Sequence, residues 1–178
     1  FVVPSFYPAY YYGGPIQSLY SLCNALAARG VEIRVLTTDT AGSGSRLGIL
    51  DFPSMTPAGY PVYFCKRLLF TSVSTQLLKN LTDFIKWSDI VHLTGVYSFP
   101  TLPTLMACKI SGRPLVWSPR GSLQRWRGTS KQRVKAIWEK ICSIAIPQKL
   151  VLHVTSKEEE RESLIRFPHC KTAVISNA

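Results

Sequence analysis

Short runs of apolar and β-branched residues alternate along this chain with longer stretches in which apolar residues recur every three to four positions. The first pattern predicts buried strands and the second predicts amphipathic helices. The expected strands are residues 1–4, 31–38, 61–66, 89–94, 114–118, 150–155 and 172–175. Because strands that alternate with helices need crossover connections, we expect an α/β fold. Its predicted form is a Rossmann-like, doubly wound and mostly parallel sheet of about seven strands, with helices on both faces.

The first expected helix is the most clearly marked of the set. It follows Gly13 and Gly14 and begins near Pro15, whose missing N–H costs nothing in a first helical turn. Gly30 follows its end, where a left-handed residue is favoured. Its apolar face consists of Ile16, Leu19, Cys23 and Leu26. We expect the helix to pack on the sheet through this face.

Two later helices are indicated by periodicity and by a capping motif. In the one that Pro147 ends, we expect the buried stripe to be Val134, Ile137, Trp138, Ile141 and Ala145. The other begins at Ser156, because a serine followed three positions later by Glu159 forms a capping box. Further acids in that first turn complement the helix dipole.

The segment 39–60 breaks the rhythm of strands and helices. It is rich in turn-forming residues, has little periodicity and is long for a connection in a compact domain. Connections of this length are usually functional or mobile. We therefore expect this segment to take part in binding.

The length and composition of the chain suit one folded domain. It has 178 residues, of which 46% are hydrophobic, so we expect residues 1–178 to form a single core. Charged residues interrupt every apolar stretch before the ~18 residues that a membrane-spanning helix needs. The first residues lack the basic and apolar regions of a signal peptide. They start like a strand already under way, so we expect a few residues to precede them.

The five cysteines are odd in number and widely separated. No C-x-x-C or C-x-x-H spacing brings metal ligands together, so we expect no metal site. Scattered cysteines in a core-forming chain are typical of reduced thiols in a cytoplasmic protein. Each is most simply interpreted as a small buried apolar side chain.

The charge of the chain is strongly positive and unevenly spread. Lysines and arginines number 21 against ten acidic residues, which gives a formal net charge of +11. Lys109 and the segment 113–140 together carry nine basic residues and a single acid, Glu139. Such a field attracts polyanions, phosphorylated small molecules or an anionic membrane surface, and does not choose between them.

Candidate chemistry follows the first expected strand. In an open parallel sheet, ligands bind beyond the carboxyl ends of the strands. There Gly13 and Gly14 lead into a helix N-terminus, where free amides and the helix dipole attract a phosphate. A tight turn that merely starts the helix explains the pair at least as well. Neither a G-x-G-x-x-G fingerprint nor a P-loop is present.

Further candidates lie in or after the fourth and fifth expected strands. Arg120, between a proline and a glycine, can pair with a phosphate or a sugar hydroxyl, and a surface salt bridge is the alternative. His92 lies within a strand, where a lone histidine is more often a core residue than a catalyst. Tyr97 and Trp126 can stack on sugar rings, although aromatic residues more often pack in cores. No Ser–His–Asp set or carboxylate pair indicates a hydrolase.

Taken in order along essentially the whole chain, six short motifs resemble those of family-4 glycosyltransferases, the large retaining group with the GT-B fold. The motifs are Gly13-Gly14-Pro15-Ile16-Gln17, Ala28-Arg29-Gly30-Val31, Asp89-Ile90-Val91-His92, Trp117-Ser118-Pro119-Arg120-Gly121-Ser122, His153-Val154-Thr155-Ser156 with Glu159, and Val174-Ile175-Ser176-Asn177. Two features depart from the family pattern. Arg120 stands where many members place a donor-contacting histidine, and Ser176 and Ala178 replace the usual proline and glycine of the closing motif.

The resemblance implies the N-terminal, acceptor-side half of a retaining glycosyltransferase, with the C-terminal donor-binding domain absent from this chain. The implied reaction moves a sugar from a nucleotide-diphosphate donor to a hydroxyl on a saccharide or lipid-linked acceptor, in cell-surface polysaccharide or lipopolysaccharide synthesis. No metal or other cofactor is expected, because cationic side chains and helix dipoles neutralise the leaving diphosphate in this group. The fragment by itself is expected to be inactive.

The resemblance also assigns roles to particular residues. His92 and Arg120 are the expected catalytic residues, and the amides of Gly13 and Gly14 are expected to contact the donor diphosphate. The substrate and acceptor cleft is expected to include Gln17, Thr94, Tyr97, Gly121 and Trp126. The basic segment 113–140 would face an anionic acceptor at the inner membrane surface. This places the protein in the cytoplasm and peripherally on the membrane.

The main competing interpretation is a basic α/β module that binds nucleic acid or another polyanion. The segment 113–140 would supply the charge, with Trp117 and Trp126 as stacking platforms. No helix-turn-helix, KH or RRM signature supports it, so we expect no nucleic-acid partner. A Rossmann-type epimerase or reductase is disfavoured because G-x-G-x-x-G and Tyr-x-x-x-Lys are both missing.

Overall fold

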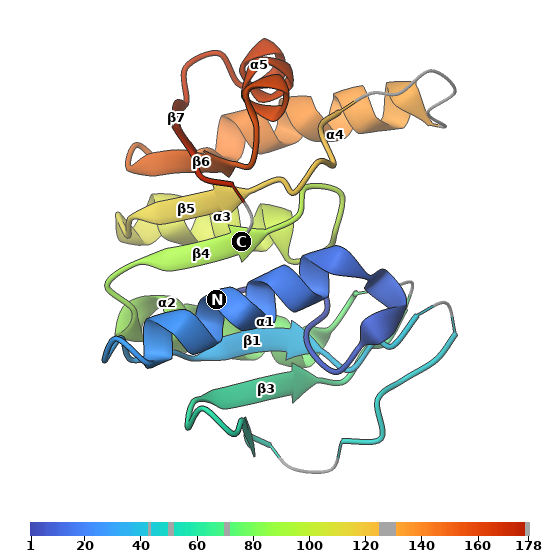
Figure 1. Ribbon diagram of the computed structural model, residues 1–178. Helices are drawn as coiled ribbons and strands as arrows, with labels where there is room; N and C mark the ends of the chain where they lie inside the picture. The colour runs from blue at the N-terminus through green and yellow to red at the C-terminus, as the bar shows by residue number, and fades with distance from the viewer. Residues whose placement is uncertain (43, 50–51, 70–71, 125–130, 177–178) are drawn as a thin grey trace. The chain divides into compact units, whose positions relative to one another are not determined.

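The computed structural model describes residues 1–42, 44–49, 52–69, 72–124 and 131–176 (Figure 1). The chain divides into two compact units, Phe1–Phe84 and Ile85–Ala178. The boundary falls within helix α2 (Thr75–Trp87), whose first turn is capped by the Ser74 hydroxyl, which accepts the amide of Leu77 at 3.2 Å.

The first unit contains a three-stranded sheet in the order β1-β3-β2. Strands β1 (Val35–Thr38) and β3 (Pro61–Cys65) are parallel, with Val35 opposite Val62, and the short β2 (Ser54–Met55) is antiparallel to β3. Helix α1 (Gly14–Ala27) is preceded by a 3₁₀ turn, η1 (Tyr10–Tyr12). The core of this unit is Val3, Phe6, Leu19, Cys23, Ile33, Val35, Tyr60, Val62 and Phe64.

The second unit contains a four-stranded parallel sheet in the order β4-β5-β6-β7, which Figure 1 shows from green to red. The strands are β4 (Val91–Thr94), β5 (Leu115–Ser118), β6 (Leu150–Val154) and β7 (Lys171–Val174). The crossover helices are α3 (Thr101–Ser111), α4 (Gln132–Ala145) and α5 (Lys157–Arg166). Because parallel crossovers are right-handed and the strands follow chain order, the three helices cover the same face of this sheet.

The predicted α/β, Rossmann-like class is confirmed, but the predicted single sheet of about seven strands is not. Among the described residues the largest sheet has four strands. The expected strand at residues 1–4 contributes only one bridge, between Val2 and Leu36. The short β2, within the segment 39–60, was not expected, because two residues are too few to leave a periodic signal.

Helix α1 follows its prediction closely. Ile16, Leu19 and Cys23 are buried, and Leu26 packs against the same core. Gly30 has the predicted left-handed backbone, with φ at 81°. Four of the five cysteines are buried, and burial raises the pKa of Cys23 to about 12, which keeps that thiol protonated. Within the described ranges, no helix is both long and apolar enough to cross a membrane.

Helix α4 is oriented differently from its prediction. Val134, Ile137 and Ile141 were expected to be buried, yet their side chains are 63%, 62% and 42% exposed. The buried residues of this helix are Glu139, Cys142 and Ala145. With 3.6 residues per turn, the helix is rotated by roughly a quarter turn from the orientation that apolar periodicity predicts. Its core-facing side thus includes a carboxylate instead of three branched aliphatic side chains.

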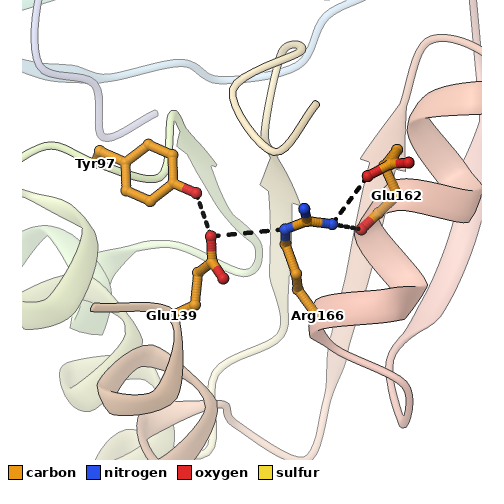
Figure 2. Close-up of polar contacts among 4 residues, drawn as sticks. All are labelled: Tyr97, Glu139, Glu162 and Arg166. Atoms are coloured by element: carbon orange, nitrogen blue, oxygen red, sulfur yellow. Dashed lines mark hydrogen bonds and ion pairs between the residues drawn. The ribbon is translucent and has the colours of Figure 1, made fainter. Parts of the chain in front are cut away.

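A polar network holds Glu139 inside the second unit, as Figure 2 shows. The Tyr97 hydroxyl donates to Glu139 Oε1, and Arg166 Nε of α5 lies 3.6 Å from the same oxygen. Arg166 also pairs with Glu162, at 3.0 Å, one turn earlier on its own helix. The Glu139 and Arg166 side chains are only 9% and 10% exposed. A buried carboxylate needs such partners, so the network explains why α4 presents this face to the core.

Trp138 supports the same orientation. Its indole Nε1 donates to the carbonyl of Val96 at 2.7 Å, in the loop that carries Tyr97. Trp117 of β5 donates to Gly95 in that loop at 2.8 Å. Two indole donors and one phenol thus connect the loop after β4 to its neighbours.

We predict that Glu139→Ala lowers the free energy of unfolding by about 2–3 kcal/mol, because it leaves Arg166 buried with only Glu162 as a partner. Urea denaturation of the full-length protein measures the change. The matched variant Lys140→Ala, at an exposed position of the same helix, should stay within about 0.5 kcal/mol of wild type. Equal effects of the two substitutions would show that the network does not stabilise the unit.

Candidate active site

The carboxyl ends of β4, β5 and β6 bring several of the predicted site residues together in the second unit. Thr94 at the end of β4 is opposite Ser118 at the end of β5. The Ser118 hydroxyl donates to the His153 carbonyl of β6 at 3.2 Å, and the Gly95 amide donates to the Ser118 carbonyl at 2.9 Å. Parallel strands in register place the loops that follow them at one edge, where α/β proteins bind ligands.

Two histidines lie side by side at this edge. The rings of His92 and His153 are 6.0 Å apart, centre to centre, in an edge-to-face arrangement. His153 Nε2 is 3.2 Å from the Ile175 carbonyl, just beyond β7. Burial, with added repulsion from His153 and Arg120, lowers the pKa of His92 to about 3. Burial also lowers the pKa of His153. Both imidazoles are therefore neutral near pH 7 and can accept or donate a hydrogen bond without carrying charge.

Arg120 occupies an uncommon backbone conformation directly after β5. Its φ is 53°, in the left-handed region, and Gly121 follows with a φ of 76°. For a residue with a Cβ this conformation costs roughly 1–2 kcal/mol. Such strain persists only where the surroundings hold it, and it is concentrated at functional sites. Two successive left-handed residues reverse the chain sharply here.

Glu159 of α5 holds this turn in place. It is only 1% exposed, and its Oε1 accepts the Gly121 amide at 2.5 Å. Its Oε2 accepts both the amide and the hydroxyl of Thr155, each at 2.7 Å. The Ser156 hydroxyl accepts the Glu159 amide at 3.1 Å, which confirms the predicted N-cap. In a capping box, the Glu159 side chain would also accept the Ser156 amide. Here it accepts the Gly121 amide instead, and so connects α5 to the turn after β5.

The electrostatics of this edge are dominated by Arg120. Partial burial lowers its pKa, and the nearby Glu159 acts in the opposite direction. Arginine keeps its charge in proteins, so a half-buried cation lies near two neutral histidines. The charge-bearing carboxylate oxygens of Glu159 are already occupied by three donors. Such a site suits an anionic group flanked by hydroxyls, for example a phosphate attached to a sugar.

A second set of predicted residues lies in the first unit, at the start of α1. Gly13 caps the helix with φ at 66°, and its amide donates to the Tyr10 carbonyl at 3.0 Å. Of the two glycine amides, that of Gly14 is therefore the one available to an incoming anion. A Cβ at Gly14 would meet nothing within 4 Å, so the space beside its Cα is open. Gln17 is exposed on the next turn.

The start of the segment 39–60 is attached to the aromatic turn before α1. Tyr12 and Thr40 are joined by a hydroxyl hydrogen bond of 3.2 Å. A Cβ on Gly42 would lie 2.8 Å from the Tyr11 ring, so only glycine permits this approach. Arg67 is 8% exposed and donates to the Gly42 carbonyl at 3.3 Å, which also holds the start of the segment 39–60 in place. Tyr10 and Tyr11 remain 64% and 70% exposed beside the helix start.

The remaining predicted site residues have other surroundings. Tyr97 donates its hydroxyl to Glu139 and lies under Lys135, whose Nζ is 5.0 Å from the ring centre. It thus takes part in the network that orients α4. Trp126 lies outside the described residues. Among the residues that the structure describes, no three potential metal ligands form a group.

Sequence reasoning did not select His153 or Glu159 as site residues. Both stood in a quoted motif, but a glutamate in a first helical turn is ordinarily interpreted as a cap. Its second role, on the turn that carries Arg120, depends on contacts across 38 residues of sequence. Side chains alternate between the two faces of a sheet along each strand. This alternation could have indicated that His92 of β4 and His153 of β6 face each other, but only if the register of the strands had been known.

A sequence model of the family described as Glycosyltransferase Family 4 matches residues 12–178. No curated protein and no solved structure matches the chain significantly. The matched range includes α1 and every element from β1 to β7.

We predict that His92 makes the folded protein less stable as the pH falls. Its folded pKa of about 3 lies below the unfolded value near 6.5, so the unfolded state takes up the proton first. Stability is therefore lost progressively below about pH 6.5. Between about pH 7.5 and about pH 5, wild type should lose on the order of 1–2 kcal/mol more than His92→Gln.

Urea denaturation at the two pH values measures this difference. The exposed His169→Gln variant is the control, and its loss should match that of wild type. The same loss in His92→Gln as in wild type would contradict the prediction.

Proposed function

The chain belongs to glycosyltransferase family 4, and on this premise we propose that it forms the N-terminal half of a retaining glycosyltransferase. The proposed reaction moves a sugar from a nucleotide-diphosphate donor to a hydroxyl of a saccharide or lipid-linked acceptor. Cell-surface polysaccharide or lipopolysaccharide synthesis is the proposed setting. The observation that carries the proposal is the strained Arg120, held by the buried Glu159 at the carboxyl edge of a parallel sheet.

Sugar transfer from such a donor develops negative charge on the departing diphosphate. Preorganised cations and amide donors stabilise that charge without the reorganisation that water would need. The rigid turn at Arg120 and Gly121 meets this requirement, because the Glu159 contact fixes the backbone before any ligand arrives. We assign Arg120 to the donor, where its guanidinium neutralises a phosphate or contacts the sugar next to it. With this cation in place, the proposed reaction uses no metal.

His92 and His153 are proposed to contact the sugar rather than the diphosphate. A neutral imidazole can accept a hydroxyl proton or donate to a hydroxyl oxygen, and both rings are kept neutral by burial. His92 keeps the catalytic role implied by the resemblance. Glu159 is a positioning residue, since its two carboxylate oxygens are used by Gly121 and Thr155.

Gly14 is proposed to give its amide to the donor diphosphate. The helix dipole of α1 and a free first-turn amide favour an anion at this end. Tyr10 and Tyr11, exposed just before the helix, offer flat surfaces on which acceptor sugars can stack. The segment 39–60 contacts this aromatic turn through Thr40, which bonds Tyr12, and through Gly42, which lies against Tyr11, and it is proposed to bind the acceptor. In this proposal a C-terminal domain holds most of the nucleotide.

We predict that Arg120→Ala lowers kcat/KM of the full-length enzyme by roughly 100-fold or more, the usual effect of losing one charge-stabilising donor. Acceptor-dependent release of UDP or GDP from nucleotide sugars measures it. Arg120→Lys should recover only part of the activity, because an ammonium cannot reproduce the planar fork of donors. Arg161→Ala, at an exposed position of α5, should retain wild-type activity. Full activity in Arg120→Ala would remove this residue from the site.

We predict that Gly14→Val weakens donor binding while the fold is kept. The new side chain meets no protein atom within 4 Å, and the backbone of Gly14 is not in the left-handed region. The loss therefore reports on the ligand, with an expected rise in the donor KM of about tenfold or more, equivalent to ~1.4 kcal/mol. Ser21→Val, an exposed position on the same helix, is the control for valine in α1. An unchanged donor KM in Gly14→Val would move the diphosphate elsewhere.

A further inference from the structure

Helix α4 exposes a continuous row of aliphatic side chains. Val134, Ile137, Ile141 and Ile144 are 63%, 62%, 42% and 68% exposed. Their spacing of three or four residues places them along one side of the helix. The Glu139 network holds a different side of the helix against the core, so burying the row would require this network to break.

Helix α3 extends this row into a broader apolar surface. It packs against α4 within the second unit, and the Lys109 ammonium donates to the Ile144 carbonyl at 2.6 Å. Met106 and Ile110 of α3 are 49% and 84% exposed beside this contact. A groove of about 360 Å³ runs between the two helices, with Met106, Ile110, Ile141 and Ile144 among its lining residues. We call the exposed side chains of Met106, Ile110, Val134, Ile137, Ile141 and Ile144 the aliphatic face.

The charges that α3 and α4 expose beside the aliphatic face are positive. Arg133 and Lys140 are exposed on α4, and Lys109 is exposed on α3 at the edge of the groove. Helices α3 and α4, both described in full, contain one acid between them, and this is the buried Glu139. The solvent-exposed part of the two helices thus combines aliphatic and cationic side chains without a single carboxylate.

We propose that the aliphatic face docks onto the surface of a membrane that contains anionic lipids. A helix that lies in the membrane interface buries an apolar side among acyl chains and keeps basic residues at the headgroups. Lysine and arginine suit this border, because their stems lie along apolar surface while their charges reach the phosphates. Each basic residue near an anionic surface contributes attraction that salt weakens. The groove between α3 and α4 offers space for part of an acyl chain.

Two other occupants fit the observations less well. A symmetric pair of copies would place the aliphatic face against itself, and would bring the Arg133 and Lys140 side chains of both copies to one interface. That arrangement brings like charges together with no carboxylate between them. Nucleic acid would use the basic residues through its phosphates, but its phosphate backbone would leave the six aliphatic side chains without an apolar partner. Only a lipid surface uses the aliphatic and the cationic side chains together.

The test is flotation of the full-length protein with vesicles. Wild type should float with phosphatidylcholine vesicles that contain phosphatidylglycerol, and much less with pure phosphatidylcholine. The double variant Ile137→Glu/Ile144→Glu should lower the partition coefficient roughly tenfold or more, because it removes two inserted aliphatic side chains. Arg133→Glu/Lys140→Glu should lower it by a similar factor and reduce its dependence on salt.

Matched controls lie on α5 of the same unit. Ile165 is 67% exposed, and Arg161 is also exposed, so Ile165→Glu and Arg161→Glu make the same types of substitution, at one position each, outside the aliphatic face. Both should bind vesicles like wild type. Circular dichroism and melting temperature show that the variants remain folded, as expected for exposed positions. Equal losses in the α5 variants, or no preference of wild type for phosphatidylglycerol, would overturn the proposal.

The alternative occupants give distinct results in the same set of variants. Sedimentation that shows a wild-type dimer and an Ile137→Glu/Ile144→Glu monomer would identify a self-association surface and overturn membrane docking. A single-stranded DNA complex weakened by Arg133→Glu/Lys140→Glu and not by the isoleucine variant, without vesicle binding, would also overturn it. The readout is vesicle binding rather than sugar transfer, so the result is independent of the proposed reaction.

Discussion

The buried carboxylate of Glu139 determines how the second unit presents its surface. Its pairing with Arg166 and Tyr97 requires one particular side of α4 to face the core, although a more apolar side was available. A hydrophobic core alone would favour the other rotation, because burying three aliphatic side chains stabilises a helix more than burying one carboxylate. The carboxylate is tolerated because its partners come from two other segments at once. The consequence is an aliphatic face that is left to solvent.

A second buried carboxylate, Glu159, likewise fixes a loop, here at the carboxyl edge of the four-stranded sheet. It accepts donors from the turn after β5 and from the end of β6, and it holds Arg120 in a left-handed conformation. In both places an acidic side chain on a crossover helix fixes a loop that follows a strand. The turn at Arg120 and the orientation of α4 therefore depend on the same kind of interaction, a buried carboxylate that pairs with donors from other segments.

Some elements and contacts were predicted correctly from the sequence, and others were not. Helix α1 was predicted together with its buried face, because Ile16, Leu19 and Cys23 recur with helical spacing and all pack into the core. The same reasoning was wrong for α4, where periodicity alone could not weigh one buried glutamate against three aliphatic residues. The Ser156 cap was predicted because capping is local. The contact between Glu159 and Gly121 was not, because it joins residues distant in the sequence.

The sequence by itself determined the α/β class, most strand positions, the family and the two loops where chemistry was expected. Those features depend on periodicity and on ordered motifs, which are properties of neighbouring residues. The tertiary structure alone decided that the strands form a four-stranded and a three-stranded sheet, that His92 faces His153, and that Arg120 is strained. It also decided which side of α4 meets solvent. These outcomes depend on register and on desolvation of charge, and neither is defined until distant segments are brought into contact.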